Sequence, residues 1–212
     1  LGDVYKRQAL SLQDPRERPS EMRAQADEKH ARFARPASDF MSYIALWNYV
    51  HEQSQKLSTS KLRKLCKDEF INFVRVREWM DLVTQLCTML KSAGHPIEKP
   101  GGGLGAGDQD PAIHTALLTG LLSSIGAKTH NSPDYLGARG TRFRIFPGSG
   151  LFKTKPDLVV AAELVETSRL WARTVAKIDP DWVIKAAGPL IRHQYSEPVS
   201  YTHLTLPTTP YV

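Results

Sequence analysis

The sharpest functional feature of the sequence is the excess of basic side chains between Asp134 and Pro156. This stretch contains one acid and five cations, which are Arg139, Arg142, Arg144, Lys153 and Lys155. Arg142 and Arg144 are two residues apart, so on a β-strand they would lie on one face. Such a row can follow the phosphates of a nucleic acid while planar side chains stack on its bases. An ordinary solvated sheet face would have the same composition, and the residues leave both interpretations open.

A second basic group accompanies the most periodic stretch of the chain, residues 60–90. Apolar residues recur there at three-and-four spacing, which predicts amphipathic helix, and the length suggests two helices with a break near Asp68. The cations fall mostly outside the apolar stripe; they are Lys61, Arg63, Lys64, Lys67, Arg75 and Arg77. A helical core with a solvated basic face is the simpler interpretation, and contact with phosphate is the functional one.

No motif in the sequence supports catalysis or metal binding. The histidines before residue 199 lack metal-ligand spacing; they are His30, His51, His95, His114, His130 and His193. The glycine-rich segment 99–111 lacks the Lys and the Ser or Thr that a Walker A loop requires, so we interpret it as an insertion loop. An independent hydrolase would have to use Glu163 and Glu166 as an acid–base pair. Three residues apart on a strand, these two would face opposite sides.

The elements that must position these residues divide into a helical first half and a strand-rich second half. We expect an extended strap over 10–19, a helix over 21–33, and a further helix capped by Ser38 or Asp39. The strongly apolar stretch 113–125 predicts a helix that completes the same bundle.

After Gly126 the pattern changes to strands and turns. Basic and apolar residues alternate over 135–152, with glycines and a proline between them. Residues 157–178 could form strands or a helix, and Thr167 with Ser168 favours a turn between two strands. Pro180 behind Asp179 is typical of a helix start. The predicted fold class is α+β, and a small barrel with one basic face would suit single-stranded nucleic acid.

The overall composition restricts the class of protein less than these motifs do. The 212 residues carry a formal net charge of +6, and 41% of them are hydrophobic, which argues against wholesale disorder. No apolar run approaches the roughly 18 residues of a membrane span. The two cysteines, Cys66 and Cys87, form no disulfide framework, so we expect a cytoplasmic location.

Both ends of the chain look foreign to the sequence between them. Residues 1–8 and 199–212 resemble translated cloning or adaptor sequence, and the second stretch carries no Asp, Glu, Lys or Arg. We therefore expect them to be non-native scars and exclude them from the fold. That interpretation makes the remaining body, residues 9–198, a piece of a longer protein.

Four segments of the first half and one long segment of the second resemble DEAH-box RNA helicases of the bacterial HrpA type. The first four are LSLQDPRERP, QADEKHARF, SDFMSYIALWNYV and KLCKDEFINFVRVREWMDLVTQL. They are similar to the helical-bundle ("ratchet") region of that family. The last, YLGARGTRFRIFPGSGLFKTKPDLVVAAELVETSRLWARTVAKIDPDWV, is similar to the oligonucleotide-binding (OB) fold that follows the bundle. The resemblance implies a bundle over 9–128, with the 99–111 insertion, and an OB-type β-barrel with a C-terminal helix over 133–198.

The resemblance also implies a function and its partners. The family couples ATP hydrolysis by two RecA-like domains to movement on RNA, and its C-terminal domains close the RNA channel. This sequence has no Walker A motif and no Asp-Glu-Ala-His box, so ATP and Mg are expected only in the parent protein and the fragment should be inactive alone. The expected partners are single-stranded RNA, including ribosome-associated RNA, and the RecA-like and winged-helix domains of the same chain. No membrane partner is expected.

Seven residues are the resulting candidates for RNA contact. They are Arg139, Arg142, Arg144, Lys153, Lys155, Arg75 and Arg77. A stand-alone RNA-binding or interaction module without a motor is the alternative to the helicase hypothesis. The sequence upstream of Leu10 discriminates the two, because a helicase frame would carry the Walker A motif and the Asp-Glu-Ala-His box.

Overall fold

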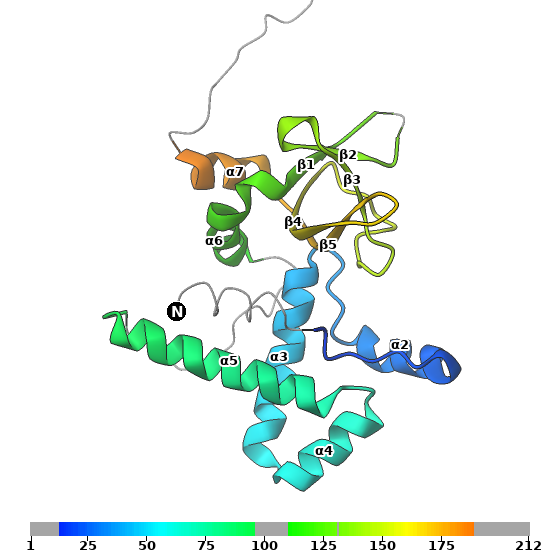
Figure 1. Ribbon diagram of the computed structural model, residues 1–212, viewed down its shortest axis with the longest axis vertical. Helices are drawn as coiled ribbons and strands as arrows, with labels where there is room; N and C mark the ends of the chain where they lie inside the picture. The colour runs from blue at the N-terminus through cyan, green and yellow to red at the C-terminus, as the bar shows by residue number, and fades with distance from the viewer. Residues whose placement is uncertain (1–12, 96–109, 131, 189–212) are drawn as a thin grey trace, which may run out of the picture.

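The computed structural model describes residues 13–95, 110–130 and 132–188. Its first half is helical and its second half forms a closed five-stranded barrel, with α3 running from the barrel to the other helices (Figure 1). The first-half elements are η1 (Ser20–Met22), α2 (Arg23–Ala31), α3 (Asp39–Lys56), α4 (Thr59–Asp68) and α5 (Phe73–Ser92). The later elements are α6 (Pro111–Leu121), η2 (Leu122–Ser124), β1 (Ile125–Lys128), β2 (Tyr135–Gly137), η3 (Ala138–Gly140), β3 (Arg142–Ile145), β4 (Leu158–Glu166), β5 (Leu170–Lys177) and α7 (Pro180–Ala187).

The start of α3 and the break between α4 and α5 lie where local sequence signals predict, whereas the helices expected over 21–33 and 113–125 are the shorter α2 and α6. The Ser38 hydroxyl accepts a hydrogen bond from the Met41 amide at 3.3 Å, so Ser38 rather than Asp39 caps α3. The break expected near Asp68 separates α4 from α5, and Asn72 caps α5. One apolar cluster unites these helices; it contains Phe33, Leu46, Val50, Leu62, Cys66, Ile71 and Val76.

An extended strap over residues 13–19 precedes the helices and is tied to the start of α5. The Glu17 amide donates to the Phe70 carbonyl at 2.8 Å, and the Asn72 amide donates to the Pro15 carbonyl at 2.7 Å. The prolines that exclude helix here leave these backbone groups free to pair across the chain. The strap therefore adds polar side chains to the surface of the helical part at a fixed position.

The barrel has the strand order β1-β2-β3-β5-β4, with β4 pairing back to β1. All pairs are antiparallel except β3 with β5. The predicted turn at Thr167 and Ser168 separates β4 from β5. The interior is filled by Tyr135, Phe143, Ile145, Leu151, Val159, Ala161, Ala172 and Val175. This arrangement confirms the predicted α+β class, with helices first, then an OB-type barrel and a C-terminal helix.

The apolar helix α6 lies beside α7 and the barrel (Figure 1), although we expected it to complete the helical bundle. Leu118 of α6 belongs to a buried cluster with Val160, Ala176 and Ile178. His114 stacks on Trp182 of α7 with ring centroids 5.5 Å apart. The apolar sequence of α6 shows only that the helix needs apolar neighbours, and the outer surface of β4 and β5 supplies them.

The N-terminus of α3 is the joint between the two halves. Ser38 forms a β-bridge with Ala176, and its hydroxyl lies 2.8 Å from His114 Nε2. The Asp39 carboxylate accepts hydrogen bonds from Gly150 N at 3.0 Å and from Val175 N at 2.9 Å. It also accepts one from the Ser149 hydroxyl. Asp39 therefore fixes the barrel loop 146–150 and β5 relative to the helices.

Several expectations fall on residues outside the described ranges. They concern the two terminal scars, most of the 99–111 insertion loop and the chain after Gly188. Within the described ranges, none of the helices has the length and the apolar character to cross a bilayer.

Candidate nucleic-acid interface

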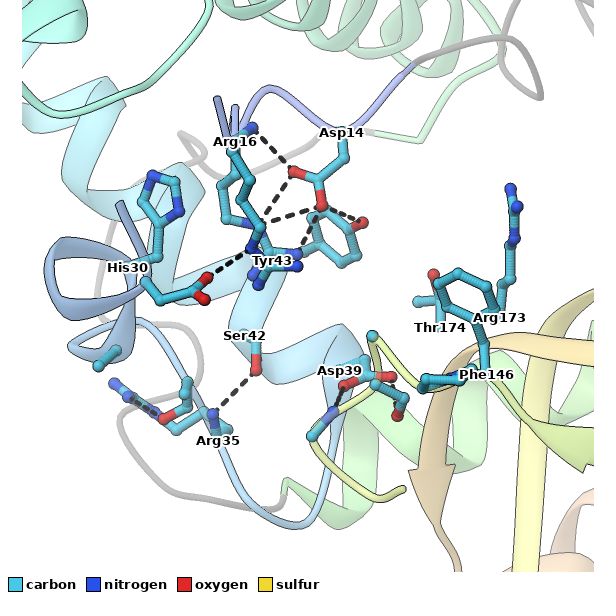
Figure 2. Close-up of a pocket in the computed structure, with 18 of the residues that line it drawn as sticks. Asp14, Arg16, His30, Arg35, Asp39, Ser42, Tyr43, Phe146, Arg173 and Thr174 are labelled. Carbon is cyan, nitrogen blue, oxygen red and sulfur yellow. Dashed lines mark hydrogen bonds and ion pairs between the residues drawn. The ribbon is translucent and has the colours of Figure 1, made fainter. Parts of the chain in front are cut away.

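A cleft of about 1120 Å³ lies between the helical part and the barrel. One wall consists of the strap, α2, the start of α3 and Arg75 of α5. The opposite wall consists of the loop 146–150 with Glu163 of β4 and Arg173 and Thr174 of β5. Figure 2 shows the two sets of side chains facing one another, with Asp39 beside the barrel loop. The hydrogen bonds of Asp39 to Ser149, Gly150 and Val175, which we call the Asp39 clamp, therefore also set the separation of the two walls.

The charged lining of the cleft is dominated by arginine. Six arginines and four carboxylates line it; the arginines are Arg16, Arg18, Arg23, Arg35, Arg75 and Arg173. Arginine matches phosphate geometry through its planar, forked donors and stays charged at any physiological pH. The lining is therefore suited to an anionic, extended ligand.

The carboxylates of the cleft are held by specific partners. Asp14 accepts from Arg16 Nη2 at 2.7 Å and from the Tyr43 hydroxyl at 3.0 Å, and Arg16 lies over the Tyr43 ring. Burial alone would raise the pKa of Asp14, but the Arg16 hydrogen bonds and charge lower it below its usual value. Burial and the Asp14 charge raise the pKa of Tyr43 to about 12. Asp14 thus stays ionised and Tyr43 protonated, so this cluster is a fixed part of the wall.

The other arginines of the helical wall are more available. Arg18 pairs with Asp27 at 2.7 Å, with both side chains nearly half exposed, and the Arg23 side chain is 72% exposed. Arg35 donates to the carbonyls of Arg32 and Ala34, and Arg75 donates to the carbonyl of Asp14 at 2.9 Å. Because carbonyl acceptors leave the guanidinium charge uncompensated, Arg35 and Arg75 can attract phosphate.

His30 is a buried neutral group behind these arginines. Its Nε2 lies 3.0 Å from the Glu69 carbonyl, while the buried Nδ1 has no hydrogen-bond partner within the described part of the chain. Burial lowers the pKa of His30, and the charges of Arg16 and Arg18 lower it further. His30 therefore adds no positive charge to the cleft at neutral pH.

The barrel wall combines an aromatic ring with an arginine. The Arg173 guanidinium lies 5.0 Å from the centroid of the Phe146 ring, and Trp171 meets that ring edge-on at 6.1 Å. Arg173 is only loosely paired with Glu163, at 3.9 Å, and its side chain is 47% exposed. This wall therefore offers a planar apolar surface next to a cation.

The candidate arginines of the barrel lie on its outer surface. The burial pattern of β3 places Phe143 and Ile145 inside and Arg142 and Arg144 outside, so the two arginines do share a face. Arg144 forms an ion pair with Asp134, whose pKa is lowered chiefly by that hydrogen bond. Neither arginine lines the cleft. However, Arg144 is the register partner of Trp171, whose edge contacts Phe146 at the cleft.

The remaining candidates are distributed over the surface. Arg75 lines the cleft, whereas Arg77, exposed on α5, does not. Arg139 lies in η3 with a φ of 57°, and Lys153 and Lys155 are exposed in the segment between β3 and β4. The structure therefore does not bring the seven candidates together in one site.

Five of the six arginines that line the cleft, and the aromatic ring of its barrel wall, are absent from the sequence candidates. These are Arg16, Arg18, Arg23, Arg35, Arg173 and Phe146. Arg16 and Arg173 lie more than 150 positions apart, so no local pattern connects them. One signal was present: Trp171 and Arg173 are two residues apart on a strand, which places an aromatic and a cation on one face.

Glu163 and Glu166, the acid–base pair that a hydrolase would require, do not meet in this cleft. Glu163 lines it opposite Arg173, but Glu166 lies at the end of β4, paired in register with Leu170. Nor do three His, Cys, Asp or Glu side chains of the described residues gather as a metal site.

Comparisons with known proteins agree with this architecture. A family model described as an oligonucleotide/oligosaccharide-binding (OB)-fold matches residues 113–191, a stretch that begins within α6. The chain is 51% identical over 194 residues to the ATP-dependent RNA helicase HrpA of Escherichia coli. It is 47% identical over 191 residues to an HrpA homolog of Haemophilus influenzae. The pre-mRNA-splicing factor ATP-dependent RNA helicase prp22 of Schizosaccharomyces pombe is 23% identical over 202 residues.

These relatives are much longer than the region they share with this chain. The alignments with the two bacterial proteins cover 90% of this chain but 14% of either relative, and the alignment with prp22 covers 95% and 16%. The helical part, the barrel and the cleft between them thus correspond to one limited segment of each helicase. Over that segment the chain is similar to the HrpA helicases, and its helices are followed by a barrel whose residues match the OB-fold family.

Proposed function

We propose that this chain is the RNA-channel region of an ATP-dependent DEAH-box RNA helicase and that its cleft binds single-stranded RNA. The observation that carries the proposal is the arginine lining of the cleft, which faces an aromatic ring on the opposite wall. Single-stranded nucleic acid is commonly held by cations along its backbone and planar groups against its bases. The outer β3 row, Arg142 and Arg144, is a second binding surface that leads to the cleft through Trp171.

The proposal assigns ATP hydrolysis to the rest of the helicase. ATP and Mg would bind to RecA-like domains, and this chain would contact them and the winged-helix domain of the same protein. The sequence lacks the Walker A motif and the Asp-Glu-Ala-His box. The chain by itself should therefore bind RNA without hydrolysing ATP. We expect the whole protein to act in the cytoplasm, with ribosome-associated RNA among its targets.

The test is a fluorescence-anisotropy titration of a labelled single-stranded RNA at several KCl concentrations. Each phosphate contact on a single strand contributes about 0.7 to the slope of log affinity against log salt. Arg23→Gln with Arg35→Gln should therefore weaken binding and reduce the slope by about 1.4. Arg142→Ala with Arg144→Ala should do the same, and an unchanged affinity and slope would overturn the assignment of the β3 row.

The control removes two charges from a surface far from the cleft. Lys61 and Lys64 are exposed on α4, at the end of α3 away from the barrel (Figure 1). Lys61→Gln with Lys64→Gln changes the net charge as much as the cleft variant but should leave the slope within experimental error. Equal losses in the cleft variant and in this control would show that net charge alone attracts RNA and would refute the assignment of the cleft.

A further inference from the structure

We propose that Phe146 is a base-stacking platform, on which one nucleobase of the bound strand lies while its phosphate contacts Arg173. This inference rests on the proposed function, because it names how the cleft holds the strand. The class of ligand is a single-stranded nucleic acid with an unstacked base. The contact is tolerant of sequence, since every base has a π face.

The Phe146 ring lies exposed in the cleft and not in the barrel core. Phe146 is 37% exposed and lines the cleft, although it directly follows a strand whose other apolar residues, Phe143 and Ile145, are buried at 2% and 3%. A large apolar ring exposed beside cations has a cost in water that a stacked base would remove. In Figure 2 Phe146 and Arg173 lie side by side on the barrel wall, opposite the arginines of the helical wall.

The Phe146 ring is held in place before any ligand binds. The Phe146 amide donates to the Ala172 carbonyl at 2.9 Å, and its carbonyl accepts from the Ser149 amide at 3.0 Å. Gly148 packs so closely that a Cβ there would lie 3.0 Å from Phe146 Cε1. The Asp39 clamp on Ser149 and Gly150 fixes the same loop. A preordered ring loses little conformational entropy on binding.

The neighbours of Phe146 are arginines and a second aromatic ring. Arg173 lies over the Phe146 ring and Arg169 lies 5.7 Å from the centroid of Trp171, so arginines and aromatic rings alternate along β5 and the end of β3. The 3.9 Å pair between Arg173 and Glu163 is loose enough to be replaced by a phosphate. One nucleotide could thus place its base on Phe146 and its phosphate at Arg173.

The experiment compares Phe146→Leu with Phe146→Tyr in binding of A10 RNA and of the same strand carrying abasic nucleotides. Leucine keeps an apolar side chain without a π face, whereas tyrosine keeps the ring. Phe146→Leu should weaken A10 binding about 5- to 100-fold, and Phe146→Tyr should retain the affinity. Neither variant removes a charge, so the salt slope should stay that of the wild type.

The abasic strand isolates the base contact. Loss of bases should weaken binding to the wild type more than binding to Phe146→Leu, because the variant has already lost the platform. The same abasic penalty in both proteins, or an unchanged affinity of Phe146→Leu for A10, overturns the platform while leaving RNA binding by the cleft intact. If the wild-type chain binds no RNA, both proposals fall. Should Phe146→Leu fail to fold by circular dichroism, quenching of 2-aminopurine in RNA bound to the wild type decides instead, and its absence at every position overturns the platform.

Discussion

Replacing Asp39 with alanine should destabilise the contact between the two halves of the molecule, because this carboxylate joins α3 to the barrel. It accepts hydrogen bonds from the amides of Gly150 and Val175 and from the Ser149 hydroxyl. Thr174, with a φ of 52°, interrupts the pairing of β4 with β5, and the next amide, that of Val175, points to Asp39. The carboxylate thus satisfies a backbone donor that the sheet itself leaves free.

The expected loss of unfolding free energy depends on whether each hydrogen-bond donor finds another partner when Asp39 is removed. Val175 is completely buried, and an unsatisfied buried amide costs about 1–3 kcal/mol. Gly150 is exposed, so water can replace the carboxylate there. Loss of a negative charge in the first turn of α3 costs a further 0.3–1 kcal/mol, approximately. Asp39→Ala should therefore lower the free energy of unfolding by about 1–4 kcal/mol and the melting temperature by roughly 3–15 °C.

The assay is urea denaturation followed by circular dichroism, with Asp181→Ala as the matched control. Asp181 also lies in the first turn of a helix, α7, but is exposed, and only its backbone amide takes part in the cap formed by Asp179. The control should cost no more than about 1 kcal/mol, which is the first-turn charge alone. If both variants lose the same stability, Asp39 acts only as a first-turn acid and the clamp argument is refuted.

Two further predictions concern the barrel core and the response to pH. Gly126→Ala should destabilise the fold by about 1–3 kcal/mol, because the new Cβ would lie 2.3 Å from Cζ of the buried Phe143 ring. Gly120→Ala, in open space on α6, is its control in the same denaturation assay and should be neutral or stabilising; equal effects would refute the clash. The folded state lowers the pKa of His30 from 6.5, so below that pH the unfolded chain binds more protons and stability should fall as pH decreases. His30→Gln should therefore reduce the change in unfolding free energy between about pH 7.5 and pH 5.5. This range lies above the acidic pH at which Asp14 titrates. An unchanged pH dependence in the variant would contradict the assignment of this effect to His30.

Local sequence signals were sufficient for most of the secondary structure. The hydroxyl of Ser38, the break after Asp68 and the turn at Thr167 and Ser168 lie where their residue types predict. Each of these signals acts within a few residues, through a capping hydrogen bond or a change of apolar period. Pro180 likewise begins α7 behind the Asp179 cap. The resemblance to HrpA-type helicases added the nature of the barrel, and the OB-fold match agrees with it.

The position of α6 and the make-up of the cleft depended on tertiary structure. An apolar helix can pack on any apolar surface, and only the folded chain shows α6 against α7 and β4. The sequence marked Arg142 and Arg144 by their local density, yet Arg144 is already paired with Asp134. Charge density along the chain is a local property, whereas a binding surface collects side chains from distant segments.

The sequence by itself determined the α+β order of elements, several caps and turns, and the similarity to one region of a helicase family. Each of these depends on residue types within a short stretch of the chain. Only the tertiary structure decided which cations face a common space. Arg16 in the strap and Arg173 in β5 lie on opposite walls of one cleft, because the hydrogen bonds of Asp39 hold the barrel against the start of α3. That contact joins residues 136 positions apart, and such a pairing depends on the packing of the whole chain.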